Sequence, residues 1–204
     1  SFMLKAYKQL IYYKIQVNDS SSMLSYIEEG LRLSAQANYH KEISMFLRFK
    51  GLYYLMEGDL DQAEKLLKDS INTLSVTEEI SNQYATNIAA AYAYIGEIYL
   101  ARKDYPRAQE EFLKAIDLSA EKNVQSSLAV FYINIGRTLY YEKNLDKSKE
   151  YFSKAQENFE TYDFYWKKSV LYSYLTLIAF EENDSEDAKK YLDLAKEADK
   201  KIKD

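Results

Sequence analysis

The chain has 204 residues, 47% hydrophobic and 29% charged, and this composition excludes a disordered polypeptide. Asp and Glu outnumber Lys and Arg by 32 to 27, and the net charge of −5 argues against a nucleic-acid-binding surface, which needs a basic stripe. With no Cys and a single His, disulfides, thiolate metal sites, cysteine nucleophiles and multi-histidine metal sites are excluded as well.

Five glycines and one proline favour long helices over a sheet protein with many tight turns. The chain does not begin with Met, and both of its ends have helical composition, which indicates a piece of a longer protein. No stretch reaches the roughly 18 apolar residues of a membrane span, and no secretory signal is visible. We therefore expect a cytoplasmic protein that does not contact a membrane.

The first predicted helix runs from Phe2 to Val17 and is apolar on more than one face. Its large apolar residues are Phe2, Met3, Leu4, Leu10, Ile11, Tyr12, Tyr13 and Ile15. The outermost helix of a repeat array normally has a polar outer face. We expect something to cover this one, either an upstream helix or a second copy of the chain, which would be a homodimer through the first helix.

The rest of the chain contains a repeated pattern of residue types. A Gly is followed twelve residues later by a small residue and four further on by a large apolar one, as in Gly51, Ala63, Leu67; Gly96, Ala108, Phe112; and Gly136, Ser148, Phe152. An Asp or Asn stands between the two blocks at Asp19, Asp59, Asp104, Asn144 and Asp184, at spacings of 40, 45, 40 and 40 residues. We predict five units, with the five extra residues in a loop near Thr77 to Ser81.

Each unit is predicted to contain two helices, with the Asp or Asn at the start of the second. Asp104 suits the N-cap, where a carboxylate accepts from the first amides of the helix, and Pro106 suits the first turn. Asp59 and Gln62 have the spacing of a capping box. The small residues allow the two helices to approach closely, and stacked units would share one core.

The pattern resembles the tetratricopeptide repeat (TPR), with Tyr92, Ile95, Gly96 and Tyr99 followed by Ala108 and Phe112. The period is 40 rather than about 34, and the usual closing Pro is absent, which implies longer helices. The resemblance implies an all-α protein, a right-handed α-solenoid of five antiparallel helix pairs forming a TPR-like superhelix. It covers one domain, 1–204, with repeats at about 1–38, 39–80, 81–122, 123–162 and 163–204. Repeats of this length are similar to those of bacterial signalling and transcription-control proteins, including peptide-pheromone receptors.

In TPR superhelices the first helix of each pair lines a concave face. When the repeats are aligned position by position with the TPR pattern, the resemblance predicts a peptide- or partner-binding site. Its residues are Arg48, Asn87, Ala90, Ala93, Asn134, Arg137, Tyr141 and Tyr174. The alanines would form an open floor, the Asn amides would bond a peptide backbone, the Arg side chains would take carboxylates, and the Tyr rings would hold apolar groups. The clamp that holds chaperone tails in some TPR proteins is not reproduced, since Tyr12, Phe49, Ala90 and Tyr94 stand at its positions.

The sequence offers no catalytic constellation. All five glycines are accounted for by packing or turns, no phosphate-binding loop is present, and His40 is expected to be a solvated residue in the turn before the second repeat. We expect a non-catalytic protein- or peptide-binding module without cofactor or metal, the sensing or docking domain of a bacterial regulatory protein. The alternative is a structural scaffold or homo-oligomerisation module with no small ligand.

Overall fold

The computed structural model describes residues 2–75, 82–122, 127–159 and 165–203, and these ranges contain ten α-helices and no strand. The predicted loop at 77–81 lies outside them. The helices are α1 (Phe2–Gln16), α2 (Met23–Gln36), α3 (His40–Glu57), α4 (Leu60–Ser75), α5 (Asn82–Ala101), α6 (Tyr105–Glu121), α7 (Leu128–Tyr141), α8 (Leu145–Phe159), α9 (Tyr165–Glu181) and α10 (Ser185–Lys203).

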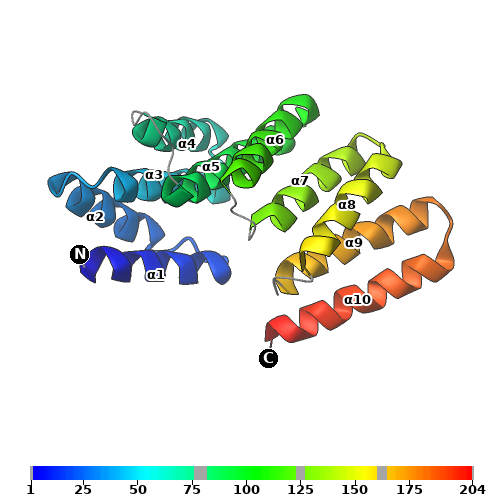
Figure 1. Ribbon diagram of the computed structural model, residues 1–204. Coiled ribbons are helices and arrows are strands. Elements are labelled where there is room, and N and C mark those ends of the chain that lie inside the picture. The colour runs from blue at the N-terminus through cyan, green and yellow to red at the C-terminus, as the bar shows by residue number, and fades with distance from the viewer. Residues whose placement is uncertain (1, 76–81, 123–126, 160–164, 204) are drawn as a thin grey trace.

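Each helix packs against the next one in the chain, so the molecule is a helical solenoid whose ends are α1 and α10 (Figure 1). Each of the five predicted repeat ranges holds one helix pair. The first helices α3, α5, α7 and α9 also contact one another in sequence, whereas the second helices make no comparable contacts among the described residues. The first helices therefore lie on the inner side of the array.

The two helices of every repeat are joined by the same turn. The residue before the repeated Asp or Asn adopts a left-handed backbone conformation with φ between 51° and 83°; these residues are Asn18, Gly58, Lys103, Lys143 and Asn183. The next amide then donates back to a carbonyl five residues earlier, as Asp104 does to Tyr99 at 2.8 Å. This is the Schellman arrangement, which satisfies the free carbonyls at the end of the first helix.

The repeated carboxylate caps the second helix in most repeats, as predicted. Asp59 accepts from the amide of Gln62 at 3.1 Å, and Asp104 and Asp184 accept from the amides three residues ahead at 3.3 and 3.0 Å. The prediction is wrong for Asp19. Here α2 begins only at Met23, so the Asp19 carboxylate instead binds Lys14 and the amide of Ser21 in the turn.

The repeated glycines are contact points between the helices of a pair, as predicted. A Cβ atom on Gly96 would lie 2.5 Å from the ring of Phe112, and one on Gly136 would lie 2.5 Å from the ring of Phe152. On Gly51 it would meet Leu67 at 2.7 Å. Real Cβ contacts are not this short, so each large side chain of the second helix rests on the bare backbone of the first.

Polar bonds join neighbouring repeats in a regular register. The residue that directly follows the end of a first helix bonds, through its side chain, to the second helix of the preceding repeat. The pairs are Arg102–Glu64, Glu142–Gln109 and Glu182–Lys149. Because successive pairs lie one repeat apart, the side of α5, α7 and α9 that carries these residues packs toward the second helix of the preceding repeat. Within the described ranges, no helix is both long and apolar enough to cross a bilayer.

Glu64 makes the most connected of these links, and we expect it to give the protein an acid-sensitive component of stability. Burial raises the pKa of its carboxyl, but hydrogen bonds from Lys68, Arg102 and Tyr99 outweigh this and lower the pKa from 4.5 to about 2. Because the folded-state pKa lies below the unfolded one, this stability is present above pH 4.5 and is lost as the pH falls toward 2.

Glu64→Gln should therefore lower the free energy of unfolding at pH 7 by about 1–2 kcal/mol, allowing for partial solvent screening. Urea denaturation of both proteins between pH 2.5 and 7 measures this difference, which should shrink as the pH falls. A constant difference across that range would show that the carboxylate's charge is not what stabilises the fold.

Candidate functional site

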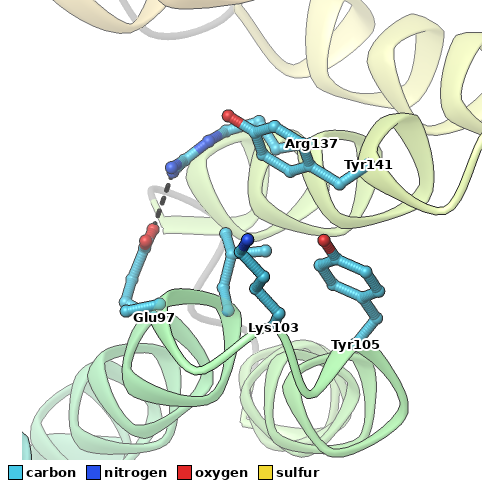
Figure 2. A pocket seen from close by; sticks show the side chains of 7 residues that line it. Glu97, Lys103, Tyr105, Arg137 and Tyr141 are labelled. Carbon is cyan, nitrogen blue, oxygen red and sulfur yellow. Dashed lines mark hydrogen bonds and ion pairs between the residues drawn. The ribbon is translucent and has the colours of Figure 1, made fainter.

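A cleft of about 300 Å³ opens on the inner side of the array, between the ends of α5 and α7. It is lined by Glu97, Leu100, Ala101, Lys103, Tyr105, Arg137 and Tyr141. Glu97 and Arg137 occupy the same position in successive repeats, 40 residues apart, and their side chains meet across the cleft (Figure 2). The repeat period itself thus brings opposite charges together.

Arg137 is the best-connected polar side chain of the cleft. Its Nη1 donates to Glu97 Oε1 at 2.8 Å and to Asn134 Oδ1 at 3.4 Å, and its guanidinium lies 5.9 Å from the ring centre of Tyr174. Its Nε is buried and makes no hydrogen bond within the described part of the chain. Burial lowers the pKa of the guanidinium, but Glu97 and Tyr174 outweigh this and raise it, so Arg137 stays charged with one donor unused.

Positive charge exceeds negative charge around the cleft. Lys103 and Arg137 line it, and Glu97 is the single carboxylate among the lining residues. Lys167, near the start of α9, lies close enough to interact electrostatically with both Glu97 and Arg137. Burial lowers its pKa to about 8, which Glu97 opposes and Arg137 reinforces. An acidic group entering here would meet a surplus of cations.

Tyrosines form the other wall of the cleft. The rings of Tyr105 and Tyr141 are nearly parallel, with centres 6.4 Å apart (Figure 2). The hydroxyls of Tyr141 and Tyr174 share a hydrogen bond of 2.8 Å, which together with burial raises the pKa of Tyr141. Tyr141 is still 46% exposed, so its ring is available to a ligand.

Arg48 and Asn87 lie elsewhere and serve the protein's own packing. They are only 7% and 8% exposed. Arg48 Nε donates to Asn87 Oδ1 at 2.6 Å, and Asn87 Nδ2 donates to the hydroxyl of Ser44 at 2.6 Å. That hydroxyl in turn donates to the carbonyl of Ser70 on α4. The expectation that Arg48 receives a ligand carboxylate does not fit this closed network, since the guanidinium faces Asn87 and the rings of Phe49 and Tyr94.

The predicted alanine floor also differs in the structure. Ala93 is buried within the core that spans α4 to α7, and only Ala90 is partly exposed. Ala93 therefore permits close packing of neighbouring first helices and does not open space for a ligand.

Of the eight predicted residues, Arg137 and Tyr141 line the cleft. Tyr174 and the buried Asn134 do not line it but bond to these two residues. Lys103 and Tyr105 were not among the predicted site residues; Lys103 lies in the turn between α5 and α6, and Tyr105 begins α6. The repeat pattern could have indicated both residues, because the turn directly follows the end of α5 and must lie beside the end of α7 in a stacked array. His40 begins α3 and is exposed. Within the described ranges, no cluster of three metal-ligating side chains occurs.

No protein-family model and no curated protein matches the chain. Solved structures match it in fold. The apo form of RapI aligns with 97% of this chain and 70% of its own, at 18% identity and a TM-score of 0.76. Aspartyl phosphate phosphatase F from Bacillus subtilis aligns with 97% of this chain and 58% of its own, at 14% identity and a TM-score of 0.70.

A third match is the Rap conjugation gene regulator of plasmid pLS20, in complex with the Phr* peptide. It aligns with 96% of this chain and 62% of its own, at 15% identity and a TM-score of 0.66. A kinesin light chain of Podospora anserina with TPR-like repeats matches as well. At these identities the likeness is one of fold, and this chain has a TPR-like repeat fold.

Proposed function

We propose that this chain is a non-catalytic binding module of a bacterial regulatory protein, and that it holds a peptide or a partner segment at the cleft between α5 and α7. The observation that carries the proposal is Arg137, a half-buried cation whose buried Nε has no hydrogen-bond partner among the described residues and which lies beside the exposed Tyr141. A site that leaves a buried N–H group unbonded is incomplete without another acceptor, because such a group costs free energy.

The chemistry of the cleft indicates the kind of ligand. Two cations, Lys103 and Arg137, line the cleft with one carboxylate, Glu97, which favours an acidic group. Tyr105 and Tyr141 offer flat apolar surface to a neighbouring side chain, as aromatic residues do at binding hot spots. The ligand we propose is a short segment that combines a carboxylate with an apolar side chain.

The fold comparison supports this reading in part. The pLS20 regulator was solved with a peptide, and its fold matches 96% of this chain over 62% of its own length. Another similar structure is described as a phosphatase. We propose no catalytic role here, because the cleft's one carboxylate, Glu97, is paired with Arg137 and the described lining residues include no Ser, Thr or Cys.

Peptide selection tests the proposal. A random peptide library selected against the wild-type chain should yield binders enriched in Asp or Glu and in apolar residues. Arg137→Ala and Tyr141→Ala should each weaken those binders by about 1–3 kcal/mol, measured by calorimetry, because each removes a contact from a desolvated site. Glu97→Gln should bind acidic peptides at least as tightly as the wild type.

Arg32→Ala is the matched control, since Arg32 is exposed on α2 and, among the described residues, forms its ion pair with Glu29 of the same helix. It should bind as the wild type does. Peptides that bind Arg137→Ala and Tyr141→Ala with unchanged affinity, while both variants remain folded, would place the ligand elsewhere on the protein.

A further inference from the structure

A hollow of about 350 Å³ opens between the second helices α8 and α10, with α9 at its base. The base consists of Leu175, Ile178 and Ala179, and these three side chains are buried. The walls are mostly polar and come from α8, from the turn after α9 and from the start of α10. The hollow shares no lining residue with the cleft between α5 and α7, so it is a separate surface.

The repeat pattern explains why this place is hollow. Ala179 aligns with Tyr54, Tyr99 and Leu139 of the three preceding repeats. Tyr99 and Leu139 are buried, and Tyr99 reaches from α5 to the second helices on both sides, since it contacts Glu64 on α4 and Arg107 on α6. An alanine is too short to bridge two helices in this way, and the space above it stays open.

The junction also loses a large apolar side chain from its second helix. Gln156 on α8 aligns with Ile71 on α4 and Ile116 on α6, and both isoleucines are buried. Gln156 itself is exposed and lines the hollow. The fourth and fifth repeats therefore meet with less apolar filling than the earlier repeats do, which leaves a polar opening over an apolar base.

A helix that followed α10 in the same solenoid would not fill the hollow. One repeat pair earlier, the contacts of Tyr99 with Glu64, Arg102 and Arg107 come from α4, from the turn after α5 and from α6. The next helix, α7, packs on α6 and α5 and makes no comparable contact with α4 among the described residues. A following helix would pack on α10 and α9 in the same way, so the occupant must come from outside the solenoid.

The filled position in the third repeat shows what kind of group fits. The ring of Tyr99 lies beside two cations, with its centre 5.8 Å from the guanidinium carbon of Arg102 and 4.6 Å from that of Arg107. Its hydroxyl donates to the carboxylate of Glu64 at 2.8 Å. The repeat geometry thus accommodates an aromatic ring flanked by positive charge, with its polar end at the preceding second helix.

The hollow carries the opposite charge at each of these three positions. Glu182 and Asp187 align with the two arginines, and Lys149 aligns with the glutamate. Lys149 pairs with Glu182, and Asp184 adds a third carboxylate to the lining. Among the described lining residues, carboxylates outnumber cations by three to one. The cations beside a ring that enters here must therefore belong to the ligand.

We infer that the hollow is a second binding site, which takes a tyrosine side chain of a partner protein from a segment rich in Lys or Arg. The ring rests on Ile178 and Ala179, in the place that Tyr99 fills in the third repeat, and its hydroxyl accepts from the ammonium group of Lys149. The flanking cations of the segment pair with Glu182 and Asp187. This ligand is opposite in charge to the one proposed for the cleft.

The first test is whether the space exists in solution. Ala179→Leu copies the residue of the preceding repeat and should leave the urea midpoint of unfolding unchanged or raise it, because the added side chain has room. Ala188→Leu is the matched control, since Ala188 is buried in the same repeat at the repeated small position where two helices cross. It should lower the midpoint. Equal destabilisation by both variants would overturn the inference.

The second test measures binding on a chain whose cleft is disabled by Arg137→Ala and Tyr141→Ala, so that failure of the cleft proposal does not affect it. The probe is a library of dodecapeptides with a fixed central tyrosine and random flanks. Peptides selected against this chain should be enriched in Lys and Arg. Ala179→Tyr, which fills the hollow from within, should weaken their binding at least tenfold.

Charge variants keep this test decisive if Ala179→Tyr does not fold. Glu182→Gln combined with Asp187→Asn should also weaken the selected peptides at least tenfold. Glu157→Gln is the control, because Glu157 is exposed on α8 and does not line the hollow, and its variant should bind as before. Selected peptides without basic flanks, or basic peptides that bind the folded charge variants with unchanged affinity, overturn the inference.

Discussion

Gly96→Leu is expected to lower the free energy of unfolding by about 2 kcal/mol. The Cβ atom alone would lie 2.5 Å from the ring of Phe112, so α5 and α6 must separate before the rest of the side chain is placed. Overpacking of this kind costs about 3 kcal/mol, and the better helix propensity of Leu returns about 1 kcal/mol. Urea denaturation followed by circular dichroism measures the difference.

Thr86→Leu is the control for this substitution. Thr86 lies on the same helix and is exposed, so the added side chain meets no neighbour. Its variant should be as stable as the wild type or slightly more stable, because only helix propensity changes. If Gly96→Leu behaved like Thr86→Leu, the tight crossing of α5 and α6 would not exist in solution.

Asn87→Leu is expected to cost about 2–3 kcal/mol of folding stability. The substitution removes the oxygen that accepts from Arg48 at 2.6 Å and leaves the guanidinium buried beside Phe49 with one partner fewer. Hydrogen bonds to a buried charged group are worth more than ordinary ones, and an orphaned charge is worse than none. Thermal and urea denaturation of the variant measure the loss.

The double variant Arg48→Met with Asn87→Leu separates the two explanations of this pair. If Arg48 and Asn87 serve packing, removing both polar groups should recover part of the stability lost in Asn87→Leu, and the selected peptides should still bind. Loss of peptide binding in this variant, with stability recovered, would instead return Arg48 and Asn87 to the binding site. This comparison decides between the sequence-based assignment and the structural one.

The sequence by itself determined the architecture, because the features that fix it are local and periodic. The repeated Gly and Ala positions mark where the two helices of a pair cross, and the repeated Asp positions mark where the second helix begins. A crossing needs a missing side chain and a helix start needs a cap, whatever the rest of the protein does. The exposed apolar residues of α1 were visible for the same reason, since a helix that is apolar on two faces needs two neighbours.

The sequence was less informative about turns and about Asp19. Lys103 and Lys143 adopt left-handed conformations usually left to Gly or Asn, and the repeat imposes that geometry on whatever residue stands there. Asp19 has the right spacing, but α2 begins three residues later, relative to this Asp, than the other second helices do. A repeated Asp or Asn predicts that a turn between two helices exists, and the residues around it decide its backbone conformation and where the second helix begins.

Only the tertiary structure decided which polar residues of the inner face line the cleft and which are buried in packing. Arg48 and Arg137 look alike in sequence, but Arg137 sits one helical turn further along its repeat than Arg48 does. Arg48 therefore meets Asn87 and two aromatic rings in the core, whereas Arg137 meets Glu97 at the edge of an open cleft. The hydrogen-bond partner of each comes from a neighbouring repeat, the following one for Arg48 and the preceding one for Arg137, some 40 residues away in the chain. Whether a side chain is buried in packing or free for a ligand depends on these distant neighbours, and no local pattern encodes them.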